Sequence, residues 1–144
     1  MGKDCHAISG YAFLIDSGAV LWSSKQQEIV SLSITESEYV AATHSLKEVL
    51  WLHSLFFDVF GPAKDATTMF CNNQSAIALA QDHQYHACTK HIDGCYHFIW
   101  WVVEQGEVWL VYCPTEDMVA DMLTKVLPSP KVKHFATNHR LCAK

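Results

Sequence analysis

The hydrophobic pattern of this chain changes from strand-like to helical period near Thr35, and that change limits which folds the chain can adopt. Before Thr35, apolar stretches at residues 8–15 and 19–23 predict two strands joined by a short turn. After it, apolar residues recur at helical spacing as far as Val59, and Gly61 marks the end of the predicted helix. A chain that opens with a hairpin and continues in a long amphipathic helix is neither all-helical nor all-β.

The other segments add strands and helices in alternation. They predict a short strand at residues 28–33, a strand at 67–71, a helix at 72–81 opened by Asn72, a helix at 89–105, a strand at 107–113, a helix at 114–125 and a short amphipathic helix at 129–140. This order predicts a mixed sheet flanked by helices, in the α/β or α+β class. The length suits one domain, so we expect residues 1–144 to form a single one.

The charge of the chain argues against a dedicated nucleic-acid-binding protein. The formal net charge is −5 at pH 7 and Arg140 is the only arginine, whereas affinity for nucleic acids comes mostly from Lys and Arg against phosphates. No uncharged apolar run could cross a bilayer, and no signal-peptide core follows the polar residues 1–6. We therefore expect an intracellular protein, cytoplasmic or nuclear, with free cysteines and no membrane partner.

Three polar side chains stand where a metal-dependent phosphodiesterase would need them. Glu38 lies in the first turns of the long helix, Asn72 directly follows the predicted strand at 67–71, and Asp121 lies on the helix after the last strand. Such an enzyme gathers carboxylates from separate elements to hold two Mg²⁺ ions. Each residue also has a purely structural interpretation: Glu38 favours the helix macrodipole, Asn72 caps a helix, and Asp121 is a solvated helix residue.

Five stretches of sequence bear on these alternatives. They are SGYAFLID with AVLWSSKQQ, then LSITESEYVAATHSLKEVLWL, CNNQSAIALAQ, HACTKHIDGCYHFI and VYCPTEDMVADMLTKVLP. In order and spacing they resemble the ribonuclease H domain of copia-type LTR retrotransposon polyproteins. The resemblance covers about residues 9–130 and leaves residues 131–144 as a C-terminal tail helix.

The resemblance implies a ribonuclease H-like fold, a mixed sheet flanked by helices. It also implies a four-carboxylate, two-Mg²⁺ site that cuts RNA in an RNA–DNA hybrid. The family's helix glutamate falls on Glu38, in SEYVA, and its last aspartate on Asp121, in VADMLTK. Its strand-end aspartate, in a word usually read CDNQSA, falls on Asn72. Glu38 and Asp121 are thus the implied metal ligands, and Asn72 stands at a catalytic position without a carboxylate.

The family's first aspartate belongs to a central strand whose word resembles DADWAG. No such word precedes Ser9, and Asp4 and Asp16 lie in the wrong places to replace it. We therefore expect the sheet to lack its first central strand. Because buried unpaired backbone groups are costly, we expect one of two outcomes. Either residues 8–15 pair directly with residues 67–71, or a partner protein or a second copy fills the gap by strand addition.

With two of four carboxylates, the site is expected to bind Mg²⁺ weakly and to be catalytically impaired. Cys88, Cys95 and Trp100 also stand where the family usually shows arginine, a pattern typical of a decayed or domesticated copy. The first hypothesis is a ribonuclease H-like binding or interaction module, with weak affinity for hybrids. The alternatives are an active Mg²⁺-dependent ribonuclease H, and a structural or interaction protein without a nucleic-acid role.

Two other features have both functional and structural interpretations. One is a cluster of potential zinc ligands, made of His83, His86, Cys88, His91, Cys95 and His97. Its spacing follows no standard finger, so we favour packed or surface side chains. The other is the pair Trp100-Trp101, a possible platform for stacked bases. We favour a core role, with one ring in the core and the other at its edge.

Overall fold

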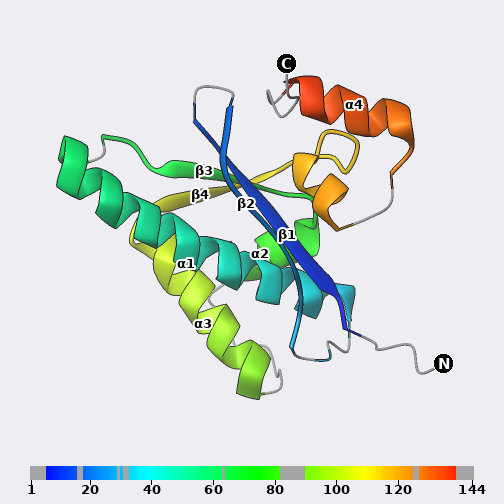
Figure 1. Cartoon of the computed structure of the whole chain (residues 1–144). Coiled ribbons are helices and arrows are strands. Elements are labelled where there is room, and N and C mark those ends of the chain that lie inside the picture. Colours follow the sequence, from blue (N-terminus) through cyan, green and yellow to red (C-terminus); the bar gives the residue numbers. More distant parts are fainter. Residues whose placement is uncertain are drawn as a thin grey trace. The chain divides into compact units, whose positions relative to one another are not determined.

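The structure is a computed structural model that describes residues 6–15, 18–28, 30, 33–62, 64–81, 90–124 and 127–138. These residues cluster in two compact units, which are described separately. The hairpin unit holds the elements before residue 32 and after residue 114, and the helix–sheet unit holds those between. Figure 1 follows the chain through both units.

The hairpin unit begins with two antiparallel strands, β1 (Ile8–Ile15) and β2 (Gly18–Gln26). The first residue of β1 lies opposite the last residue of β2, and the register shifts once, between Phe13 and Leu14. Such a shift increases the local twist of an antiparallel pair.

A buried polar pair closes the open end of the hairpin. Gln27 donates from Nε2 to Oγ of Ser9 at 2.7 Å, and its backbone N–H donates to the carbonyl of Ala7 at 2.8 Å. Gln27 and Ser9 are both buried. Their burial is tolerated because each supplies the other with a hydrogen bond.

The same unit holds the 3₁₀ helix η1 (Val119–Leu123), which packs on β1. At Gly10 the two elements approach so closely that an added Cβ would lie 2.6 Å from the side chain of Thr124. From β2, Ser24 donates through Oγ to the carbonyl of Leu123 at 2.5 Å. The hairpin therefore fixes the position of η1.

The helix–sheet unit begins with the long helix α1 (Ile34–Phe60). It starts at Ser33, whose Oγ accepts a hydrogen bond from the N–H of Glu36 at 3.1 Å, as an N-cap does. It ends at Gly61, where φ is 82° and the N–H donates to the carbonyl of Phe57 at 2.9 Å. Glycine adopts this left-handed conformation without steric cost.

A parallel pair of strands, β3 (Thr67–Cys71) and β4 (Val108–Tyr112), completes the unit together with two helices. Helices α2 (Gln74–Gln81) and α3 (Lys90–Glu104) lie on the connection between the strands, since parallel strands need a crossover. α3 packs against both α1 and α2. The buried apolar side chains of this unit are Tyr39, Val40, Leu46, Val49, Ala80, Tyr96, Ile99, Val102 and Val108.

The α+β class expected from the sequence is confirmed, because an antiparallel hairpin and a parallel pair combine with helices. The C-terminal helix is confirmed as α4 (Ser129–Asn138). The predicted strand at residues 28–33 falls partly outside the described residues, and its described residues 28, 30 and 33 are not in a strand. One local prediction is wrong. Within the described part of 114–125, turns lead into the short η1 rather than a longer helix.

The predicted direct pairing of residues 8–15 with residues 67–71 is also wrong. Among the described residues, β1 hydrogen-bonds to β2 and β3 to β4, and neither pair extends further. Each strand thus satisfies one edge through a partner in its own unit. Strand addition by a partner protein or a second copy stays a prediction.

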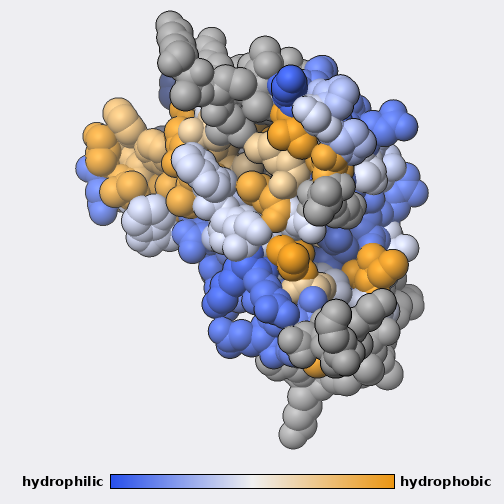
Figure 2. Space-filling model, turned by 45° about the vertical axis from the view of Figure 1, so that its right-hand side comes forward, coloured by the Kyte–Doolittle hydropathy of each residue, from blue (hydrophilic) through white to orange (hydrophobic). Residues whose placement is uncertain are grey.

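Many large apolar side chains reach the surface, where Figure 2 shows hydrophobic residues between hydrophilic ones. Trp22 on β2, Trp51 on α1 and Trp109 on β4 are each more than half exposed. Within the described residues, no helix combines the length and the apolar character that a membrane span requires.

Replacing Gly10 by alanine should destabilise the hairpin unit by roughly 1–3 kcal/mol, because the new methyl group overlaps Thr124 and lies 3.2 Å from the carbonyl oxygen of Ala120. Urea denaturation of the variant should show the loss as a lower midpoint. Gly18→Ala is the matched control, since its Cβ would meet only the carbonyl of Ile15 at 3.6 Å. Equal midpoints for the two variants would show that η1 does not need the close approach.

Candidate active site

Helix α1 lies along one face of β3 and runs in the opposite direction. His53 contacts Thr67 through Nε2 and Oγ1, 2.6 Å apart, and Ser45 contacts Met69 through Oγ and Sδ, 3.7 Å apart. Thr67 and Met69 are two apart in the strand, so they point to the same face. Moving forward along β3 therefore means moving toward the N-terminus of α1.

Glu38 lies where this arrangement leads, at the carboxyl end of β3. Burial raises the pKa of the Cys71 thiol, and the negative charge of Glu38 raises it further, against a lowering contribution from a backbone hydrogen bond at Asn73. Cys71 is the third residue of the same strand face. A charge on α1 thus acts directly on the last residue of β3.

Asn72 follows that residue and stands at the same end of the strand. Its interpretation as the cap of α2 is not supported: the N–H of Ile77 donates to the carbonyl of Asn73 at 3.2 Å, which makes Asn73 the residue that starts the helix. Asn72 is half-buried between strand and helix. The structure therefore leaves its side chain without the capping role.

The parallel pairing of β3 and β4 brings both carboxyl ends to one edge of the sheet. The pairing continues past the strands, since the N–H of Cys113 donates to the carbonyl of Cys71 at 2.9 Å. Ligand sites in sheets with parallel strands form at such carboxyl ends. Asn72 follows β3 at this edge, and the charge of Glu38 contributes to the raised pKa of Cys71, the last residue of β3.

Asp121, the third sequence-predicted site residue, belongs to the hairpin unit. It lies in η1 and is 5% exposed, so it is a buried residue and not the solvated one of the structural interpretation. Its carbonyl accepts the N–H of Thr124 at 3.2 Å. The contacts of η1 with Gly10 and Ser24 hold this buried carboxyl group in place.

Glu38 and Asn72 together offer one carboxylate and one neutral amide oxygen. In the described part of the chain, no group of three or more His, Cys, Asp or Glu side chains could hold a metal ion. The helix–sheet unit alone therefore has a donor set that does not fit a pair of Mg²⁺ ions, because such ions need several oxygen ligands and a high negative charge. This part of the site can position a polar group but carries little charge.

The other candidate ligands are only partly described. His83, His86 and Cys88 lie outside the described residues, and so does any zinc site that needs them. Cys71, Cys95 and Cys113 are free thiols, as expected, whereas the other three cysteines lie outside the described residues. Asp93 pairs with His97 across one turn of α3, at 3.4 Å.

One contact near the sheet has no signal in the sequence, namely the bridge made by His53. Besides Thr67, this imidazole contacts Glu107, with Nδ1 and Oε2 3.0 Å apart. The bridge ties α1 to the start of both strands, at the end of the sheet opposite to Asn72. Only the fold brings together three residues so distant in the chain.

Of the two adjacent tryptophans, for which we expect one ring in the core and one at its edge, Trp100 is half-buried and Trp101 is 49% exposed. The neighbouring Ile99 and Val102 occupy the buried face of α3 instead.

Comparison with known proteins shows that the homologues of this chain are retrovirus-related Pol polyproteins from transposons. The polyprotein of transposon TNT 1-94 from Nicotiana tabacum is 43% identical over 123 residues, which is 85% of this chain. Those of transposons RE1 and RE2 from Arabidopsis thaliana are each 32% identical over 93% and 92% of the chain. The chain spans 9% of the length of each of these relatives. No protein-family model and no solved structure matches it.

Glu38→Gln should lower the pKa of Cys71, because the nearby negative charge that raises it is removed. At about pH 8 a larger fraction of the thiol is then ionised, so Cys71 should react faster with iodoacetamide in a peptide-resolved mass-spectrometric assay. Glu36→Gln, the same charge change two residues earlier on α1, should leave the rate unaltered. An unchanged rate for Glu38→Gln would mean that this carboxylate does not lie at the end of β3.

Proposed function

We propose that this chain is the ribonuclease H domain of a copia-type retrotransposon polyprotein, with an impaired catalytic site. Three observations support the proposal. The homologues are transposon Pol polyproteins, and the fold combines a hairpin, a parallel pair and helices. In addition, Asn72 directly follows the last residue of β3, Cys71, whose pKa the charge of Glu38 helps to raise. The impaired domain acts as a binding or interaction module and not as an efficient nuclease.

The observation that carries the proposal is Asn72 at the carboxyl end of β3. A two-metal nuclease needs a carboxylate at this point, since the ions bridge the attacking water and the leaving oxygen. An amide offers one neutral oxygen in its place. Because Asn73 is the residue directly before α2 and its carbonyl accepts the N–H of Ile77, the asparagine at position 72 is not explained by helix capping.

The magnitude of the lost interaction decides its effect. Two unit charges 4 Å apart interact by about 4 kcal/mol at the effective dielectric constant of a protein surface. Each 1.4 kcal/mol corresponds to about a tenfold change in affinity. Even a third of the Coulomb energy therefore changes Mg²⁺ affinity by about ten times.

Binding of an RNA–DNA hybrid belongs to the same proposal, with low affinity. The chain has a net charge of −5 and a single arginine. Phosphate contacts therefore depend on lysines, which bind as point charges and not as bidentate forks. An active Mg²⁺-dependent ribonuclease H is the competing function, and the assays below separate the two.

The purified chain should show no measurable cleavage of an RNA–DNA hybrid with Mg²⁺, because the site is under-charged. Product formation from an end-labelled hybrid is the measurement. Mg²⁺-dependent cleavage that Glu38→Gln abolishes would instead establish an active ribonuclease H.

Asn72→Asp should raise Mg²⁺ affinity at least about tenfold in calorimetric titrations, because it returns a carboxylate to the sheet edge beside Glu38. Asn73→Asp is the matched control. It makes the same chemical change one residue later, where an aspartate caps α2. If the two variants bind Mg²⁺ equally, position 72 is not part of a metal site.

Hybrid binding should weaken steeply between about 50 and 200 mM salt, because the affinity is electrostatic. Fluorescence anisotropy with a labelled hybrid measures this dependence. A tight complex that persists at physiological salt would contradict the proposed weak binding.

A further inference from the structure

An apolar ridge lies on the solvent side of α1, formed by Trp51, Leu55 and Val59. These residues are spaced by four, so they follow one line along the helix. Their side chains are 57%, 44% and 62% exposed. The ridge spans about 12 Å along the axis, at 1.5 Å per residue.

The side chains of the ridge are exposed and do not belong to the buried core of the helix–sheet unit. The opposite side of α1 buries Leu46 and Val49 and contacts the sheet through His53. An amphipathic surface helix ordinarily presents charged or polar residues to solvent on its second face. Contiguous exposed apolar side chains, with a tryptophan among them, mark interaction sites.

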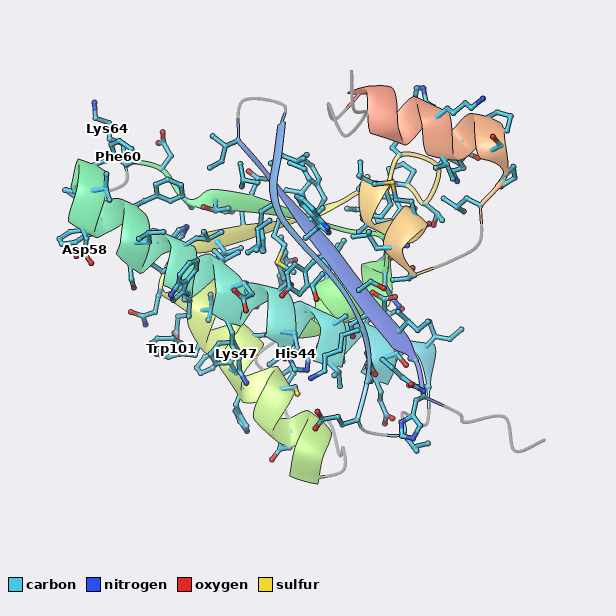
Figure 3. The ribbon with its side chains drawn as sticks, viewed as in Figure 1. His44, Lys47, Asp58, Phe60, Lys64 and Trp101 are labelled. Carbon is cyan, nitrogen blue, oxygen red and sulfur yellow. The ribbon has the colours of Figure 1, made fainter. Side chains whose placement is uncertain are left out.

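Two opposite charges flank the ridge, with Lys47 at its N-terminal end and Asp58 at its C-terminal end. They are eleven residues apart, just over three complete turns, so both lie on the same side of the helix. Figure 3 shows both side chains leaving α1 on one side, with Trp101 of α3 beside Lys47. Lys47 is also held in place, because its Nζ lies 5.9 Å from the centre of the Phe98 ring.

We propose that this ridge is a homodimer interface, on which α1 of a second copy of the chain packs antiparallel. In an antiparallel helix pair, like flanks face each other. Lys47 of each copy then approaches Asp58 of the other, and Trp51 packs against Leu55. In a parallel pair, the side of α1 that carries Lys47 and Asp58 would face the opposite side of the partner helix. Lys47 and Asp58 would then have no partner of opposite charge across the interface. The charge pattern therefore selects a two-fold symmetric, self-complementary contact.

The size of the ridge also predicts how strong the dimer is. Three turns of one helix, with Trp101 at the edge, cover less than the roughly 800 Å² per partner of a standard stable interface. The dimer is therefore weak and forms at high concentration. The dimer interface does not include Glu38 or Asn72. The result of the dimer test is therefore independent of the result of the tests of the proposed function.

Sedimentation velocity of the full chain over a range of concentrations tests the interface. The wild type should shift from monomer to dimer, and Trp51→Ala should raise the dissociation constant about tenfold or more, because each dimer loses two central tryptophans. Trp22→Ala is the matched control, since Trp22 is 58% exposed but lies on β2. Circular dichroism verifies that both variants fold. A wild type that stays monomeric, or equal weakening by the two variants, would overturn the proposal.

Charge exchange tests the antiparallel arrangement. Lys47→Asp and Asp58→Lys should each weaken self-association, because each homodimer then contains two like-charge contacts. An equimolar mixture of the two variants should associate again, since in the mixed dimer both contacts join opposite charges. The double variant should likewise dimerise. Association in neither the mixture nor the double variant would rule out the pairing of Lys47 with Asp58.

Discussion

Helix α1 lies along β3 through alternate strand residues, and the arrangement of the helix–sheet unit depends on that contact. His53 sets one end of the contact, Ser45 its middle and Glu38 its far end. Since the helix is rigid and continuous, the bridge at His53 also limits where Glu38 can lie. A polar network at one end of the sheet thus supports the geometry of the candidate site at the other.

In the hairpin unit, close packing rather than a hydrogen-bonded bridge fixes the position of the candidate residue Asp121. Close packing fixes η1 against β1, and the absence of a side chain at Gly10 permits it. The buried pair of Gln27 and Ser9 closes the hairpin. Together these contacts give the buried Asp121 a defined backbone, although its segment is a 3₁₀ helix of only five residues.

Local patterns predicted the elements well and their long-range relations poorly. The hairpin, the ends of α1 and the strand at residues 67–71 follow from apolar periodicity and from cap residues such as Gly61. The pairing of β1 with β2 follows from the predicted hairpin, whereas the partner of β3 could not be predicted, because non-local pairing depends on which strand edges meet in space. The positions of Glu38 and Asn72 came from resemblance, and the bridge of His53 had no signal, because its partners are distant in the chain.

Asn73, and not Asn72, directly precedes α2, and this has a consequence for how the sequence of this fold can change during evolution. The carbonyl of Asn73 accepts the hydrogen bond from the N–H of Ile77 at the start of the helix. The helix therefore does not need a capping side chain at position 72. Most harmful substitutions act by lowering stability toward a threshold. A substitution at this point can alter the charge of the sheet edge while the protein still folds. The charge at this sheet edge and the stability of the fold can therefore change independently. A chain of this kind can keep its fold when selection no longer maintains the residue at position 72.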